Sequence, residues 1–100
     1  MVQRGKIIDI IQLTENVTQV IVQSKHGDNF FPICFTAYQD MIACIVEIGL
    51  EKRDVVKINY YLKSKKFENK YFTSAIIENI KIIEKRQEQY TIDMDTGEII

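Results

Sequence analysis

Hydrophobic residues follow a helical spacing in only one stretch of this chain, and this limits the folds that it can adopt. Strand-like patterns of apolar residues run over residues 2–13, 17–23, 30–37, 55–63 and 71–83. Between the third and fourth of these, residues 39–50 show helical spacing, with Asp40 as a candidate N-cap and Gly49 as a candidate helix end. The predicted order is therefore strand-strand-strand-helix-strand-strand.

Local features refine this order. Doubled isoleucines on either side of Asp9 predict a coiled first strand that turns both of its sides to the core. The polar segment 25–29 predicts a hairpin loop, and the lysine-rich segment 64–70 predicts a second one. Pro32 predicts an edge or a bulge near the start of the third strand, because proline cannot donate a hydrogen bond to a ladder.

Five short strands with a helix between the third and fourth match the OB-fold, a small Greek-key β-barrel. The fold class predicted here is thus all-β with one helix, and a mixed sheet covered by one helix is the alternative. We expect the barrel to occupy residues 1–84. Residues 85–100 are rich in acidic side chains, and for them we expect a tail or a loosely held extra hairpin.

Composition excludes several other classes of protein. A chain of 100 residues with 46% hydrophobic residues predicts one folded domain, and no apolar run is long enough to span a membrane. Two cysteines and one histidine are too few for a disulfide scaffold or for most zinc sites, so we expect no metal and no cofactor. With no secretion signal and no catalytic motif, we expect a non-enzymatic protein in the cytoplasm of a bacterium or of a phage-infected host.

Aromatic and basic residues gather in the same part of the sequence. Nine of the ten aromatic residues fall in residues 30–38 and 60–72, and the second window lies among five lysines and a single glutamate. Aromatic rings can stack on any base, and lysines neutralise phosphates, so this pattern is typical of proteins that bind single-stranded nucleic acid.

Alternation along the strands separates core rings from exposed rings. Tyr60 shares a side with apolar neighbours and is predicted to be core, whereas Tyr61 shares a side with lysines and is predicted to be exposed. By the same reasoning Phe35 is core and Tyr38 is a binding candidate, while Phe67 is expected at a hairpin tip. The candidate binding residues are Tyr38, Lys57, Tyr61, Lys63, Lys65, Lys66, Phe67, Lys70 and Tyr71.

Three segments, 4–8, 32–38 and 60–73, together resemble the bacterial and phage single-stranded-DNA-binding proteins, above all their short members. The resemblance implies that Tyr38 and Phe67 stack bases. It also implies that lysines of the last hairpin follow the phosphate path, namely Lys63, Lys65 and Lys66. The chain departs from this family in having no tryptophan and a short loop at residues 25–29.

The predicted partner is single-stranded DNA in replication, recombination or repair. A single small barrel offers a short groove, so we expect a homodimer or higher homo-oligomer that multiplies the sites. The resemblance further implies that replication proteins are recruited by the acidic end of the chain, residues 93–100, which is a loose counterpart of the family's acidic C-terminal tip. Two alternatives stay open: an OB-fold RNA-binding or primosome-type accessory protein, and a protein-interaction module whose aromatic patch is an interface.

Overall fold

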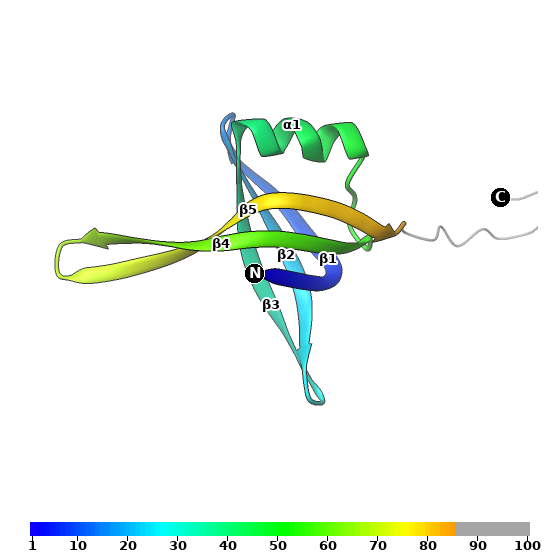
Figure 1. Cartoon of the computed structure of the whole chain (residues 1–100), viewed down its shortest axis with the longest axis horizontal. Helices are drawn as coiled ribbons and strands as arrows, with labels where there is room; N and C mark the ends of the chain where they lie inside the picture. Colours follow the sequence, from blue (N-terminus) through cyan, green and yellow to red (C-terminus); the bar gives the residue numbers. More distant parts are fainter. Residues whose placement is uncertain (86–100) are drawn as a thin grey trace, which may run out of the picture.

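The structure, a computed structural model, describes residues 1–85; of the predicted tail, only Lys85 lies within this part. The elements follow the predicted order (Figure 1). They are β1 (Val2–Thr14), β2 (Val17–His26), β3 (Asn29–Tyr38), α1 (Gln39–Ile48), β4 (Val55–Phe67) and β5 (Lys70–Glu84).

The strands form a closed barrel in the order β1-β2-β3-β5-β4. All neighbours are antiparallel except β3 and β5, which pair in parallel at Phe35–Ala75 and Thr36–Ile76. Closure leaves few unpaired strand edges within the barrel. This topology confirms the predicted OB-fold and not the alternative mixed sheet.

The barrel interior is filled by apolar side chains from every strand and by Ile45 of α1. Phe35 is fully buried, as predicted, and its ring meets that of Tyr60 edge-on, with centroids 5.0 Å apart. Tyr60 is half-buried against this core. The largest fully buried aliphatic side chains are Ile7, Val20, Val22, Val56 and Ile58.

The doubled isoleucines of β1 have a specific structural cause. The register with β2 shifts between Ile7 and Asp9, so one residue of β1 is extra at this point. As a result Ile7 is buried and Ile10 packs against the core, whereas Ile8 and Ile11 are exposed. In a strand without a bulge, Ile7 and Ile10 would point to opposite sides, because three positions separate them. β1 therefore faces the core with both of its sides in turn, as predicted, and the change of side takes place at the bulge.

Both predicted hairpin loops are shorter than expected. The turns occupy only residues 27–28 and 68–69, and the flanking residues continue the strand ladders up to His26–Asn29 and Phe67–Lys70. The lysine-rich sequence suggested a loop, but lysine side chains extend freely from an exposed strand. β2 is accordingly ten residues long rather than seven. Pro32 lies where β3 pairs with β2 alone, which confirms the edge prediction.

The ends of α1 agree only partly with the prediction. Tyr38 is the N-cap and makes no side-chain cap hydrogen bond, so the assignment of Asp40 as the cap is wrong. Asp40 instead lies in the first turn, where a carboxylate interacts favourably with the helix dipole. Gly49 ends the helix as predicted, in the left-handed conformation with φ of 68°. Val46 is 74% exposed, so the buried side of the helix is narrower than its sequence spacing suggested.

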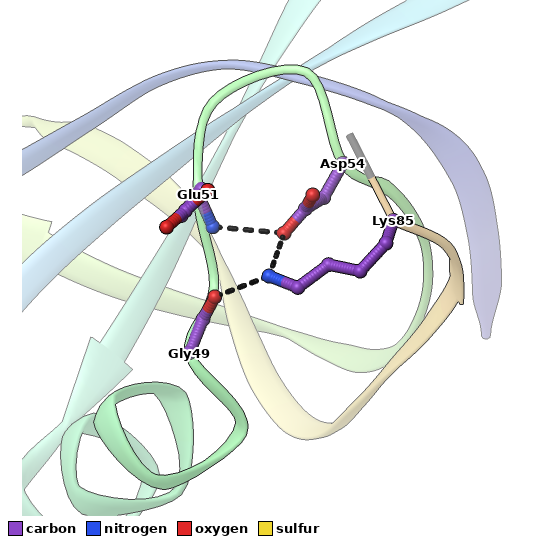
Figure 2. A network of polar contacts seen from close by, with 4 residues as sticks. All are labelled: Gly49, Glu51, Asp54 and Lys85. Carbon is purple, nitrogen blue, oxygen red and sulfur yellow. Dashed lines mark hydrogen bonds and ion pairs between the residues drawn. The ribbon is translucent and has the colours of Figure 1, made fainter. Parts of the chain in front are cut away.

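Hydrogen bonds to a buried carboxylate connect the segment after α1 with the residue that follows β5 (Figure 2). Asp54 is fully buried, and its Oδ2 accepts hydrogen bonds from the Glu51 backbone N–H at 2.9 Å and from Lys85 Nζ at 3.0 Å. Lys85 Nζ also donates to the carbonyl oxygen of Gly49. The network therefore joins the segment after α1 to the last described residue of the chain.

We expect Asp54→Ala to lower the free energy of unfolding by about 1.5–3 kcal/mol, because it removes hydrogen bonds to a charged acceptor and leaves donors unsatisfied. Urea unfolding followed by circular dichroism measures this change. Glu47→Ala, at an exposed position of α1, is the control and should shift stability by no more than about 0.5 kcal/mol. Equal stability of the two variants would contradict a structural role for the network.

Gly5 marks the point where β1 passes from one neighbour to the other. Residues 2–6 of β1 pair with β4, and residues 6–14 pair with β2. At Gly5 the backbone comes so close to β2 that a Cβ atom would overlap the Val22 side chain and the carbonyl oxygen of Gln23. A backbone oxygen in a ladder cannot move aside cheaply, so this position requires glycine.

Gly5→Ala should therefore destabilise the barrel by about 1–3 kcal/mol, the usual cost of overpacking. The melting temperature, compared with that of Lys6→Ala at the next, exposed position, measures the effect. A Gly5→Ala protein as stable as Lys6→Ala would show that β1 and β2 can separate at this point without cost.

Candidate nucleic-acid interface

The β4–β5 hairpin extends well beyond the barrel (Figure 1). β1 pairs with β4 no further than Tyr60, where the Met1 amine donates to the Tyr60 carbonyl oxygen at 3.0 Å. On the other side, β3 pairs with β5 only at Ala75 and Ile76. Residues 61–74, which we call the arm, therefore pair chiefly with each other and present both of their faces to solvent.

The register assigns each arm residue to one of two faces, because directly opposed residues in antiparallel strands point to the same side. No register shift occurs between Tyr60 and Phe67. The first face, with its continuation at residue 76, holds Tyr61, Lys63, Lys65, Phe67, Lys70, Phe72, Ser74 and Ile76. The second face, with its continuation at residue 75, holds Leu62, Ser64, Lys66, Tyr71, Thr73 and Ala75.

Tyr38 joins the first face from a different part of the sequence. It is the last residue of β3 and the N-cap of α1, and the parallel pairing of β3 with β5 brings this junction beside the arm. A groove of about 290 Å³ results. Its lining consists of Tyr38, Lys63, Lys65, Phe72, Ser74 and Ile76.

A second groove of about 580 Å³ continues from the first, since Tyr38 and Ile76 line both. Tyr61 lines this second groove, and so do Asp40 in the first turn of α1 and Glu78 of β5. The combined groove therefore has lysines from the arm and carboxylates from α1 and β5. The lysines attract phosphates, and the carboxylates repel them.

The structure brings together four of the nine predicted binding residues. Tyr38, Tyr61, Lys63 and Lys65 line the two grooves, and the two tyrosine side chains are 49% and 42% exposed. An exposed ring beside a lysine in an open groove is available to stack on a base.

The other five predicted residues line neither groove. Lys66 and Tyr71 lie on the second face of the arm, where the ammonium is 5.9 Å from the ring centroid. Phe67, 63% exposed, and Lys70 flank the turn on the first face. Lys57 lies on the barrel itself, on the same side of β4 as Tyr61 but four residues away.

Sequence reasoning missed Phe72, which is 56% exposed and lines the smaller groove. Phe72 pairs with Lys65 because the turn contains only residues 68–69. A two-residue turn would have placed Phe72 on this face and Tyr71 on the other. Because a long loop was expected here, the alternation that places Phe72 beside Lys65 was not recognised.

The described residues were also compared with the requirements of metal sites, reactive thiols and membrane-spanning helices. Residues 1–85 contain no group of three or more potential metal-ligating side chains from His, Cys, Asp and Glu. Both cysteines are free and exposed, and partial burial raises the pKa of the Cys34 thiol, which keeps it protonated and weakly nucleophilic at neutral pH. No helix among the described residues has the length and hydropathy to cross a membrane.

Comparison with solved structures supports the fold. One crystal structure of the mitochondrial single-stranded DNA binding protein Rim1 from S. cerevisiae superposes with a TM-score of 0.68 at 10% identity, covering 88% of this chain and 96% of that chain. A second crystal form gives 0.61 at 13% identity, covering 86% and 95%. The chain shares their fold. At such low identity the likeness establishes nothing more.

The small single-stranded DNA-binding protein from Streptomyces coelicolor superposes more loosely, with a TM-score of 0.47 at 13% identity over 82% of this chain and 91% of that chain. No known family model and no curated protein matches the sequence.

Proposed function

We propose that this protein binds single-stranded DNA along the grooves between Tyr38 and the arm. One observation carries the proposal: Tyr38 and Phe72, from elements distant in sequence, line one open groove together with Lys63 and Lys65. Rings for stacking and cations for phosphates thus occur side by side on one surface.

The physical requirements of single-strand binding are met at this site. Each base stacked on an aromatic ring contributes about 1–3 kcal/mol, irrespective of its sequence. Each lysine that contacts a phosphate releases counterions from the strand. Exposed aromatic rings add little to the stability of a small barrel, so a ligand gives a reason for their position.

The choice of DNA is supported by the solved structures of the same fold, which are those of a mitochondrial single-stranded DNA binding protein. Stacking and phosphate contacts do not themselves distinguish DNA from RNA, since only a contact to the 2′-hydroxyl does so. Binding by stacking and charge needs no cofactor and no catalytic group.

In the cell, the protein would coat transient single strands during replication, recombination or repair, in the cytoplasm of a bacterium or an infected host. One small barrel covers few nucleotides, so assembly as a homodimer or larger homo-oligomer would raise its effective affinity. Recruitment of replication proteins by residues 93–100 belongs to the same proposal and falls outside the described residues.

Adjacent aromatic residues on opposite faces of the arm provide a matched test. We expect Phe72→Ala to weaken binding of oligo-dT by about 1–3 kcal/mol, because it removes a stacking ring from the groove. Tyr71→Ala, at a side chain that is 70% exposed on the second face, should change binding much less. Fluorescence-quench titration measures both, and equal losses would move the site away from the groove.

Neighbouring lysines test the phosphate path in the same way. Lys65→Glu should weaken binding strongly and reduce the slope of log K against log salt by about 0.7 or more, because Lys65 lines the groove. Lys66→Glu makes the same change in net charge on the opposite face and should have the smaller effect. If both variants lose the same affinity, the arm acts only through its overall charge.

Titration with oligo-dT and with oligo-U of the same length decides between DNA and RNA. Tighter binding to oligo-U would favour an RNA-binding role. Failure to bind either strand at low salt would contradict the proposal and favour a protein interface at the aromatic groove.

A further inference from the structure

Three cations lie in register across three neighbouring strands of the barrel. Lys57 of β4 is paired with Arg4 of β1 on one side and with Lys81 of β5 on the other. The residues that flank Lys57 in β4, Val56 and Ile58, are fully buried, so Lys57 points to the outside of the barrel. We call Arg4, Lys57 and Lys81 the cation row.

The cation row is electrostatically unfavourable for the isolated fold. Neighbouring strands lie about 4.8 Å apart, and like charges directly opposite each other destabilise a sheet. Lys57 is in addition half-buried, which strengthens the repulsion. An anionic ligand would relieve this cost.

No carboxylate of the described residues forms an ion pair with the row. Asp9 pairs with Lys52, and Asp54 pairs with Lys85. In β5, Glu78 and Glu84 each lie three residues from Lys81, and neither forms an ion pair with the row. Residues 1–85 therefore supply no ion-pairing carboxylate for these cations.

The outer surface of β4 connects the cation row to the second groove, which Tyr61 lines. Lys57, Asn59 and Tyr61 occupy alternate positions on one side of the strand, and four residues correspond to about 13 Å. Between the row and the groove, Asn59 is opposite Asn79, and the Asn59 Oδ1 is enclosed without a hydrogen-bond partner among residues 1–85. Asn79 is exposed, and its amide can hydrogen-bond to a base.

Glu78 lies in the register shift of β5 between the groove and the row. Its carboxylate repels phosphates but accepts hydrogen bonds from the N–H donors of bases, such as the amino group of cytosine or adenine or the N3–H of thymine. A strand crossing this region would therefore turn its bases toward Glu78 and place its next phosphates at the cation row.

We propose that the cation row is a second phosphate subsite, which holds the same single strand after it leaves the second groove. The proposal rests on the proposed function and extends the binding path from the arm along β4 to β1 and β5. Its ligand is the phosphodiester backbone, and only a strand long enough to span both regions would reach it.

The test compares two oligo-dT lengths, about 5 and about 15 nucleotides, within the 4–16 nucleotides that one OB fold covers. In the Arg4→Gln/Lys81→Gln protein, we expect at least a tenfold loss of affinity for the longer strand and little change for the shorter one. The salt slope for the longer strand should fall by about 1.4, the value for two phosphate contacts.

The matched control is Lys25→Gln/Lys52→Gln, which removes the same net charge from positions outside the row and both grooves. It should bind both lengths nearly as the unaltered protein does. Thermal melting and light scattering of both variants report folding and mass.

Three results would overturn the subsite. These are unchanged affinity for the longer strand, an equal loss for both lengths, or a change in oligomeric mass at unchanged affinity, which would make the row a contact between copies. If the unaltered protein binds neither length, the proposed function itself fails, and this outcome is distinct from the other three.

Discussion

Closure of the barrel through β1 is the constraint on which the rest of the structure depends. β1 hydrogen-bonds to β4 with its first residues and to β2 with the remainder, and the change of neighbour takes place at Gly5 and Lys6. Only glycine allows the close approach to β2 at this point. The pairing of β1 with both β2 and β4 closes the barrel. Without it, the strands would form an open sheet, and the core around Ile7 would be exposed to water.

The same closure leaves the arm outside the barrel. β1 ends its pairing with β4 at the Met1–Tyr60 contact, and β3 pairs with β5 over only two residue pairs. The arm therefore keeps two open faces, and its register decides which rings meet Tyr38. Phe72 faces the groove because a two-residue turn places it opposite Lys65, whereas Tyr71, one residue earlier, points away.

Charge is distributed unevenly over a chain whose net charge is −1. Lysines from the arm and carboxylates from α1 and β5 line the combined groove, and three cations are aligned on the outside of β1, β4 and β5. The buried Asp54 is held by hydrogen bonds with Glu51 and Lys85 and stabilises the fold. The overall balance of acidic and basic residues thus says little about which surfaces attract phosphates.

Alternation and spacing in the sequence were sufficient to predict the order of the elements, the helix end at Gly49 and the core position of Phe35. They also predicted the exposure of Tyr38 and Tyr61, because the two sides of one strand are a local property of its pattern. Which residues of different strands lie opposite each other is not local. It depends on turn length, bulges and barrel closure, so only the tertiary structure revealed Phe72 in the groove and aligned Arg4 with Lys57 and Lys81.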